Sequence, residues 1–409
     1  MLLTACFFLF DKSTCFIDSI CSFNSVSLAK SFYRSYRLST KTKKKKIIFI
    51  VAGRLGKTLT VSKAVPFTTH PDVAKVYIFR EEEGFSIAGA EYVELPVFIR
   101  QLKPAFLRKI ARFLSEPIQL IRYAKREKPD LINGVFTLPK GLNAVLAARI
   151  SRRKSVVSVI GGTVEITTRF PFQRFWTWFN LQMLKKADAV TTKGSRVTAY
   201  LIQQGINKEK IFNLNGSIDI EMFYPDDQTK QDIDILFVGT FRKLKGPDRV
   251  IKIIENLVTE GRDIKAVFLG NGSLLKETEN YIQQNDLKKQ IQLKGYVNSP
   301  AGYFQRSKMI IMPSVSEGLP TSMLEAMACG CVPVVSDVGN ITDAAHHEEN
   351  ALVISDWNDI DGFTQAAARL LDEPGLREKL SKEGRKTVIE NYSPDKQAEV
   401  VERMFRFLF

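Results

Sequence analysis

Two glutamates, Glu317 and Glu325, lie eight positions apart in a segment that could bind a ligand rich in hydroxyl groups. An ionised carboxylate only accepts hydrogen bonds, so two of them suit hydroxyl donors. A Gly-Leu-Pro turn at 318–320 separates Glu317 from the start of a helix, where Thr321 and Ser322 supply hydroxyls. The free N–H groups of a helix start attract phosphate. Phosphate beside a polyol is what a nucleotide sugar presents.

The flanks of this segment strengthen that interpretation. The apolar run 309–312 predicts a strand that leads into Glu317, and a second run at 332–337 predicts the next strand after the helix. An ordinary buried helix with two incidental acids would show the same spacing, but the strand–turn–helix–strand context favours a ligand site. The candidate contacts in this segment are Glu317, Gly318, Leu319, Pro320, Thr321 and Glu325.

A second loop carries the cations that a diphosphate needs. The apolar run 235–239 predicts a strand that ends in Gly, and the loop after it contains Arg242, Lys243 and Lys245. Ligands of open α/β sheets bind at the carboxyl ends of the strands, where such a loop would lie. Guanidinium and ammonium groups pair well with phosphate oxygens. A solvated basic loop is the alternative interpretation.

Glycines follow two further predicted strands. Gly270 and Gly272 come directly after the run 265–269, and glycine permits close approach of a ligand to the backbone. Gly53 and Gly56 follow the apolar run 47–51. The neighbouring Lys-Thr suggests a P-loop, but Val51 stands where the first glycine of that motif belongs, so we reject a P-loop.

The segment 317–325 resembles the E-x7-E signature of family 4, the retaining, GT-B-fold glycosyltransferases of the "glycosyl transferases group 1" type. The resemblance covers nearly everything after residue 45 and is strongest from about 235 to 355. It implies that Glu317 contacts the donor sugar and Glu325 the ribose, while Lys245 neutralises the pyrophosphate. The arginine of the family's phosphate loop falls on Thr240 here, and we expect Arg242 to substitute for it.

The resemblance assigns further residues. It implies that the turn with Gly272 approaches the donor, that Tyr296 and Val297 meet the nucleotide base, and that the loop with Gly53 and Gly56 faces the cleft between two domains. The stretch 215–225 is similar to an N-G-V-D element that closes the N-terminal domain, with an extra residue inserted.

Two positions depart from the family pattern. Many relatives have a histidine before the glycine of the loop at 160–163, which touches the sugar; this chain has Ile160 there and no histidine nearby. Glu165 is the alternative polar group within reach of that loop. Asp343 takes the place of a glutamate in a G-G-x-x-E element.

The implied reaction moves a hexose-type sugar from a UDP- or GDP-sugar to an acceptor hydroxyl with retention at the anomeric carbon and no obligatory protein nucleophile. Lys245, Arg242 and the helix start would stabilise the leaving diphosphate, with Glu317 at the sugar. We expect these three side chains to be catalytic. Because no D-x-D motif lies in a fitting place, we expect neither metal nor cofactor.

The length and composition of the chain indicate its fold class and number of domains. A chain of 409 residues is too long for one ordinary core, and strands that alternate with helices indicate an α/β fold with parallel sheets. We expect a GT-B fold: an extension at 1–45, an acceptor-binding Rossmann-like domain at 46–226, a nucleotide-sugar-binding one at 227–389, and a last helix at 390–409 that packs on the first domain. Five cysteines without disulfide or metal spacing favour a reducing compartment.

The net charge of +15 predicts an anionic partner, although it also serves solubility. No apolar run reaches the about 18–20 residues that a membrane-spanning helix needs. The segments 98–130 and 169–186 combine basic residues with aromatic or aliphatic ones, which suits an anionic membrane surface and a lipid-linked or oligosaccharide acceptor. A core-packed helix with a solvated basic face is the alternative. We therefore expect a cytoplasmic protein that binds the inner face of the membrane peripherally.

Two other functions remain open at this point. A GT-B-fold nucleotide-sugar epimerase would need further acid–base residues, and only three histidines are present. A non-catalytic nucleotide-sugar-binding protein is suggested by Thr240 and the missing histidine. No nucleic-acid-binding motif accompanies the positive charge, so we expect no nucleic-acid partner.

Overall fold

The computed structural model describes residues 46–53, 64, 67–68, 70–80, 89–93, 105–167, 172–226 and 228–409. The chain divides into two compact units, Met1–Gly216 with Gln397–Phe409, and Ser217–Lys396. The boundary after Gly216 lies ten residues before the one expected after residue 226. The residues between belong to the second unit, where the Ile218 N–H donates to the Tyr392 carbonyl at 2.8 Å and Arg385 donates to the Phe223 carbonyl at 3.1 Å. The expected extension at 1–45 lies outside the described residues.

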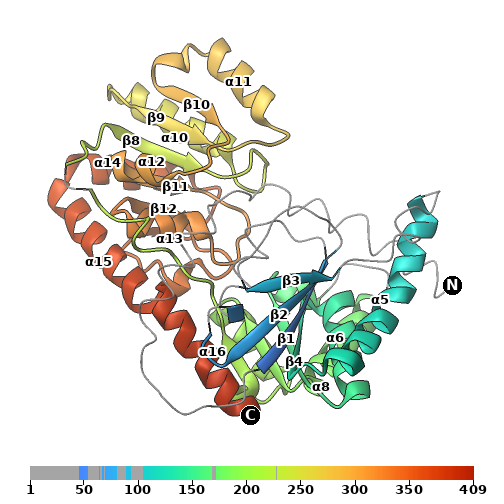
Figure 1. Cartoon of the computed structure of the whole chain (residues 1–409). Helices are drawn as coiled ribbons and strands as arrows, with labels where there is room; N and C mark the ends of the chain where they lie inside the picture. Colours follow the sequence, from blue (N-terminus) through green and yellow to red (C-terminus); the bar gives the residue numbers. More distant parts are fainter. Residues whose placement is uncertain are drawn as a thin grey trace. The chain divides into compact units, whose positions relative to one another are not determined.

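The first unit is built on a parallel sheet of seven strands in the order β3-β2-β1-β4-β5-β6-β7 (Figure 1). The buried apolar runs formed strands as expected, since a strand covered on both faces needs no polar alternation. The strands are β1 (Lys46–Gly53), β2 (Val73–Arg80), β3 (Ala90–Val93), β4 (Leu131–Val135), β5 (Lys154–Val159), β6 (Ala189–Thr192) and β7 (Ile211–Asn213).

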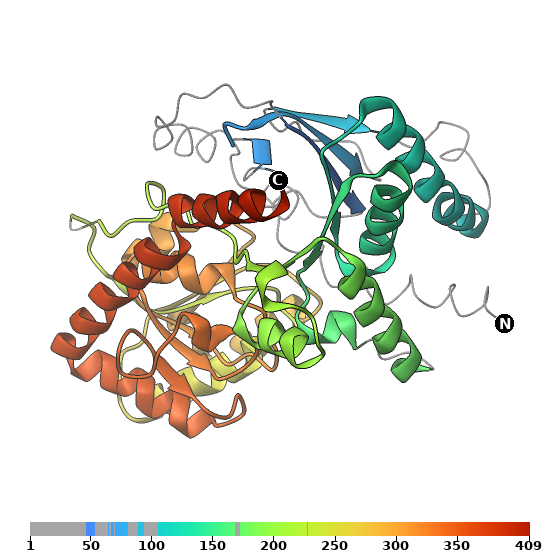
Figure 2. The same ribbon diagram turned by 90° about the horizontal axis from the view of Figure 1, so that it is seen from below.

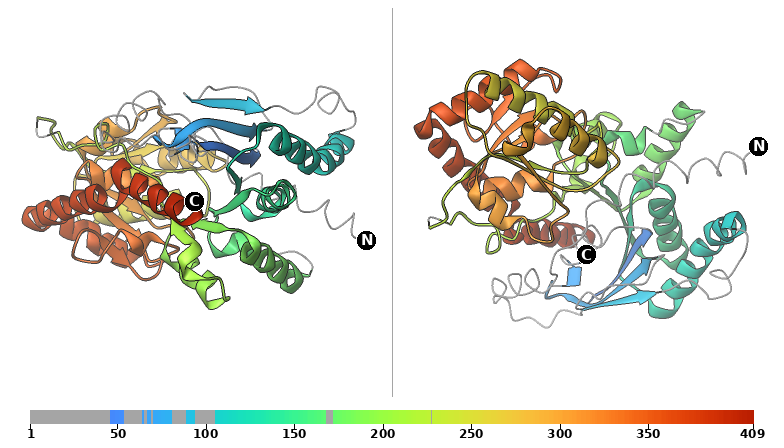
Figure 3. Two further views of the ribbon diagram at one scale, coloured as in Figure 1. Left: turned by 60° about the horizontal axis from the view of Figure 1, so that its bottom comes forward. Right: turned by 90° about the horizontal axis from the view of Figure 1, so that it is seen from above.

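Alternate residues of these strands face two different cores. Ile48 and Ile50 belong to one core with Val401, Met404 and Phe405 of the last helix, α16 (Pro394–Leu408). This helix runs beside the strands of the sheet (Figure 2). Residues of opposite parity, such as Phe49 and Val157, belong to cores on the other side of the sheet, where further helices pack (Figure 3). These helices are α5 (Ala105–Glu127), α6 (Leu142–Ser151), α8 (Gln173–Lys186) and α9 (Ser195–Gln203), and the short helices of the unit are η2 (Thr137–Gly141), α7 (Thr163–Ile166) and η3 (Lys208–Lys210).

The second unit has a parallel sheet of six strands in the order β10-β9-β8-β11-β12-β13. Its strands are β8 (Ile233–Val238), β9 (Ala266–Leu269), β10 (Ile291–Gly295), β11 (Ser307–Met312), β12 (Val332–Ser336) and β13 (Leu352–Ile354). The helices are α10 (Pro247–Thr259), α11 (Leu275–Gln284), η4 (Leu287–Lys289), α12 (Ala301–Arg306), α13 (Thr321–Ala328), η5 (Ile341–Asp343), α14 (Ile360–Asp372) and α15 (Pro374–Tyr392).

Two α/β units with parallel sheets confirm the predicted fold class. Among the described residues, no helix is both long and apolar enough to cross a bilayer.

Candidate active site

The loops that we expected to bind the ligand follow four neighbouring strands of the second unit. The strands β10, β9, β8 and β11 are consecutive in the sheet and parallel, so their carboxyl ends share one edge. The loops 295–297, 270–274, 239–246 and 313–320 therefore lie along this edge, which is where ligands of open α/β sheets bind.

Lys245 and Glu317 meet between two of these loops. The Lys245 Nζ lies 2.5 Å from the Glu317 Oε1, although the residues are 72 positions apart. The Ser314 hydroxyl donates to the same carboxylate oxygen at 2.8 Å. The Glu317 side chain is only 7% exposed and that of Lys245 24%, so the ion pair is largely desolvated and stronger than one at the surface. Sequence reasoning missed Ser314, which has no motif of its own.

A close backbone contact fixes the carbonyl of Glu317. Gly339, in the loop after β12, has φ +60°, and a Cβ at this position would lie 1.6 Å from the Glu317 carbonyl oxygen. The Asn340 N–H donates to the Gly318 carbonyl at 3.0 Å. Only glycine fits this approach, so the loop after β12 packs directly against the main chain of Glu317.

The loop after β8 is also held by the loop after β9. The Phe241 N–H donates to the Asn271 carbonyl at 3.0 Å, and the Leu274 N–H donates to the Phe241 carbonyl at 2.9 Å. A Cβ on Gly272 would lie 2.6 Å from that carbonyl oxygen. The predicted close approach at Gly272 is thus an approach to the protein's own main chain.

Glu325 lies on α13, about one turn after its first residue, Thr321. It is partly buried, and among the described residues its carboxyl group has no hydrogen-bond partner. Burial raises the pKa of this carboxyl group to about 8, because the charged form loses hydration without compensation. An unsatisfied acceptor of this kind is a natural partner for ligand hydroxyls.

The helix α13 begins directly after the Gly-Leu-Pro turn. Pro320 is the N-cap with φ −70° and ψ 124°, and Thr321 is the first helical residue. No side chain caps this helix start. Leu319 is buried at 2% exposure, and its side chain packs inside the protein.

The remaining sequence candidates take various positions. The Arg242 side chain is half-buried and makes no ion pair or hydrogen bond within the described part of the chain; Thr240 precedes it in the same loop. Tyr296, 46% exposed, and Val297 follow β10 instead of continuing it, because the strand ends at Gly295. Gly53 ends β1 in the first unit. Gly56 lies outside the described residues.

Glu165 is committed to the protein's own backbone. Its carboxylate accepts hydrogen bonds from the N–H groups of Thr137 at 2.6 Å, Ile160 at 2.8 Å and Gly161 at 2.7 Å. These donors follow β4 and β5, so Glu165 joins two loops at the carboxyl edge of the first sheet. Burial raises the pKa of this carboxyl group to about 7. Glu165 therefore holds the two loops together, and its carboxylate is already occupied by backbone N–H groups.

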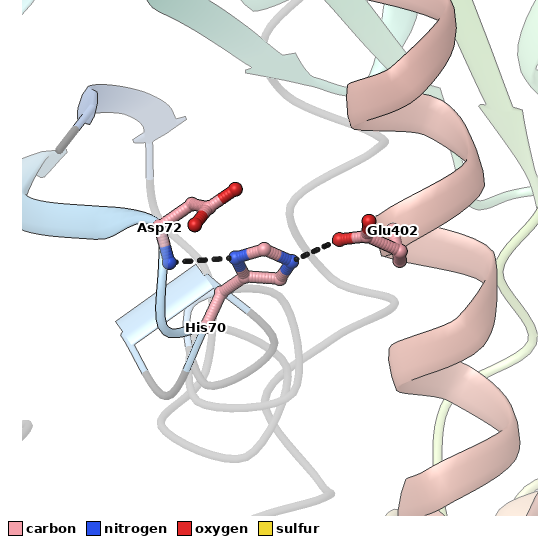
Figure 4. Close-up of side chains that lie close together, drawn as sticks. All are labelled: His70, Asp72 and Glu402. Atoms are coloured by element: carbon pink, nitrogen blue, oxygen red, sulfur yellow. Dashed lines mark hydrogen bonds and ion pairs between the residues drawn. The ribbon is translucent and has the colours of Figure 1, made fainter. Parts of the chain in front are cut away.

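One group of side chains has the spacing of metal ligands within the described residues: His70, Asp72 and Glu402 (Figure 4). The Asp72 N–H donates to the His70 Nδ1 at 3.2 Å, which leaves the proton on Nε2. That nitrogen lies 3.1 Å from the Glu402 Oε2 and donates to it. Since the Nε2 lone pair is engaged in this N–H, we interpret the group as a hydrogen-bonded contact between α16 and the segment before β2.

Comparison with known proteins identifies the family to which this site belongs. The family model described as "Glycosyl transferases group 1" matches residues 223–387, which contain the Lys245–Glu317 pair and Glu325. Residues 223–387 are a group 1 glycosyltransferase domain. This glycosyltransferase is 24% identical over 322 residues to an Escherichia coli protein named UDP-Gal:alpha-D-GlcNAc-diphosphoundecaprenol alpha-1,3-galactosyltransferase, covering 74% of this chain and 82% of the relative. It is 22% identical over 371 residues to the capsular polysaccharide biosynthesis glycosyltransferase CapM of Staphylococcus aureus, covering 85% and 95%.

Solved structures agree on the fold of this glycosyltransferase. A glycosyltransferase from Rickettsia africae matches with a TM-score of 0.71 at 17% identity, over 90% of this chain and 99% of the other. HepE of Anabaena, crystallised with UDP and glucose, matches with a TM-score of 0.70 at 14% identity, over 88% and 99%. These likenesses confirm the GT-B fold predicted from the sequence.

Proposed function

We propose that this group 1 glycosyltransferase transfers a hexose-type sugar from a UDP- or GDP-sugar to a hydroxyl of a lipid-linked or oligosaccharide acceptor, with retention at the anomeric carbon. The proposal rests first on the ion pair between Lys245 and Glu317, whose charged groups lie 2.5 Å apart. This pair lies at the carboxyl edge of the second sheet, and Glu317 precedes the start of α13 by four residues. The names of the relatives support it: the Escherichia coli protein is named for a diphosphoundecaprenol acceptor, and CapM for capsular polysaccharide.

Each residue has a role in this proposal. The Lys245 ammonium and the Arg242 guanidinium neutralise the diphosphate as it leaves, together with the N–H groups at the start of α13. Glu317 accepts hydrogen bonds from sugar hydroxyls, and the partnerless carboxyl group of Glu325 accepts them from the ribose. Tyr296 and Val297 follow the end of β10 on the same strand edge, and in this proposal they contact the base. No metal or cofactor is needed for these roles.

The test is a transfer assay with the full chain. Purified protein is incubated with UDP- and GDP-hexoses and with a short-chain polyprenyl diphosphate sugar as acceptor, and the product is followed by mass spectrometry and by the anomeric proton coupling. We expect an α-linked product from an α-linked donor. Release of nucleotide with inverted product would refute retention. Binding without transfer, unchanged by Glu317→Gln, would favour the non-catalytic binder.

We further propose that the helices on the face of the first sheet opposite α16 bind an anionic membrane, which is where lipid-linked acceptors reside. Half of the exposed large apolar side chains of the described residues fall between residues 118 and 178. They include Phe172, Phe175 and Trp178 at 70%, 49% and 56% exposure at the start of α8, with Leu146 and Ile150 on the neighbouring α6. Exposed aromatic and aliphatic side chains of this kind insert at a lipid interface.

The charges of this region support the same partner. Residues 115–188 contain thirteen Lys and Arg but five Asp and Glu. Each acid bonds to the protein itself: Glu116 to Lys140, Glu127 to Tyr77 and Arg126, Asp130 to the Ile47 N–H, Glu165 to three amides, and Asp188 to Ser155. Most of the described cations, such as Lys125, Arg152, Lys185 and Lys186, are exposed and can attract anionic lipids.

Sedimentation with vesicles tests this surface. We expect the protein to bind vesicles that contain phosphatidylglycerol and to release at high salt. The double variant Phe175→Ser/Trp178→Ser should bind at least about tenfold more weakly, since each aromatic contributes about 1 kcal/mol or more of burial. Ile389→Ser, on α15, is the control. Equal binding of both variants would refute the surface.

A further inference from the structure

Arg249, in the first turn of α10, is a buried arginine without an acidic partner. It is 8% exposed, and no carboxylate among the described residues forms an ion pair with it. Burial lowers the pKa of its guanidinium, yet an arginine stays charged at neutral pH. Burying such a cation is costly unless its N–H groups are satisfied, so its contacts should reveal what it does.

Its contacts join two loops. The Nε donates to the Pro313 carbonyl at 2.9 Å, and Nη2 donates to the Lys243 carbonyl at 2.9 Å. Pro313 begins the loop after β11, and Lys243 lies in the loop after β8. The guanidinium carbon also lies 4.8 Å from the centre of the Trp357 ring, in cation–π contact.

The main chain leaves room for this guanidinium. Gly246, the N-cap of α10, has φ +69°, and a Cβ there would lie 2.4 Å from Nη2 of Arg249. The planar group therefore packs directly on the glycine. A flexible ammonium could satisfy one of the two carbonyls, but the fixed fork of a guanidinium reaches both at once.

The two loops that Arg249 joins carry Lys245 and Glu317. Lys243 is two residues before Lys245, and Pro313 is four residues before Glu317. One backbone bond, from the Val315 N–H to the Leu244 carbonyl at 2.9 Å, runs in parallel with the bridge. The position of Lys245 relative to Glu317 thus depends on a few contacts, of which Arg249 makes two.

We propose that Arg249 is a positioning residue. It holds the loop after β8 against the loop after β11 and thereby fixes the position of Lys245 relative to Glu317 at the donor site. The inference deepens the proposed function and rests on it for the donor. Arg249 acts through the two loop carbonyls and does not touch the donor itself.

The first test needs no ligand. Lys245 is labelled by reductive methylation under native conditions, and its rate is compared with that of Lys308, which pairs with Asp234 at 2.6 Å and is similarly exposed. Glu317→Gln calibrates the rate for an unpaired Lys245. We expect Arg249→Lys and Arg249→Met to speed labelling of Lys245 about threefold or more, towards the rate in Glu317→Gln, and to leave Lys308 unchanged.

Faster labelling of Lys308 would reveal that Arg249→Met does not fold correctly. In that case Arg249→Lys is the deciding variant. Arg262→Lys is the matched control, because Arg262 makes its bidentate pair with Asp372 elsewhere in the same unit. Unchanged labelling of Lys245 in Arg249→Lys would overturn the proposal.

The second test uses UDP and GDP in titration calorimetry. For the nucleotide that the wild type binds, we expect Arg249→Lys to weaken affinity about tenfold, and to cause little further loss in a Lys245→Met background, since the two residues act through one loop. Independent losses would overturn the proposal. If the wild type binds neither nucleotide, the proposed donor fails, while the labelling experiment still decides the role of Arg249.

Discussion

The Lys245 ammonium and the Glu317 carboxylate form an ion pair at 2.5 Å across the loops after β8 and β11, two strands that are neighbours in the sheet. In the proposed reaction the two groups serve different parts of the donor, the diphosphate and the sugar. In the free protein each neutralises the other. Donor binding must therefore redistribute the contacts of Lys245, and the variants of the pair should behave differently from one another.

Glu317→Gln should separate binding from transfer. We expect transfer to fall by about 100-fold or more, because a hydrogen-bond acceptor at the reacting sugar is weakened. Affinity for the nucleoside diphosphate should stay equal or increase, since Lys245 no longer has a competing carboxylate. Steady-state kinetics and calorimetry with the same preparation check both parts. Glu378→Gln, at an exposed i,i+4 pair on α15, is the control. A loss of affinity without a loss of turnover would contradict these roles.

Lys245→Met should act on binding. A hydrogen bond to a charged group contributes about 1.5–3 kcal/mol, so affinity for the nucleoside diphosphate should fall about 10- to 100-fold. Affinity for the nucleoside without phosphates should not change. Lys382→Met removes a surface lysine from the same unit and should leave both affinities as they are. Equal losses for nucleoside and diphosphate would place Lys245 away from the phosphates.

Nucleotide binding should release a proton from Glu325. With a pKa of about 8, this carboxyl group is about 90% protonated at pH 7 in the free protein. If the ribose hydroxyls bind the carboxylate, roughly 0.9 proton leaves per nucleotide at pH 7 and roughly 0.1 at pH 9. Calorimetry in buffers of different ionisation enthalpy measures this number, and Glu325→Gln should abolish it. Proton-neutral binding at pH 7 would exclude a carboxylate–ribose contact.

The same group should affect stability. Its pKa is raised in the folded state, so the protein favours the protonated form, and stability declines as pH rises from the unfolded value of about 4.5 through about 8. Glu325→Gln removes this penalty. The variant should unfold at a higher temperature than the wild type at pH 9 and at nearly the same temperature near pH 4. A lower unfolding temperature at pH 9 would show that the buried charge is compensated.

Glu165→Gln should loosen two loops of the first unit. At pH 8 the carboxylate accepts three backbone N–H groups, whereas the amide nitrogen of glutamine faces either that of Thr137 or those of both Ile160 and Gly161 as a second donor. One unsatisfied buried N–H costs about 1–3 kcal/mol. We expect a lower unfolding temperature and faster hydrogen exchange at Thr137 or at Ile160 and Gly161. Unchanged exchange at all three amides would contradict the observed bonding.

Most of the fold could be predicted because its central strands are buried on both faces. The continuous apolar runs at 47–51 and 235–239 became β1 and β8 within two residues. The short strands β3, β7 and β13 were not predicted. They have three or four residues each, and such a length carries no usable periodicity.

The site was predictable only in part for a related reason. The eight-residue spacing of Glu317 and Glu325 is local, so sequence reasoning found both. The pairing of Lys245 with Glu317 depends on β8 lying beside β11, and strand order is a property of the whole sheet. Arg249 gave no signal at all, because an arginine in the first turn of an amphipathic helix normally faces solvent.

The most direct test of the donor site is titration calorimetry of UDP and GDP against the wild type, Lys245→Met, Glu325→Ala and the control Lys382→Met. The account predicts that the wild type and the control bind one of the two nucleotides with equal affinity, and that both site variants bind it at least about tenfold more weakly. Binding that is the same in all four proteins would place the nucleotide elsewhere and contradict the account.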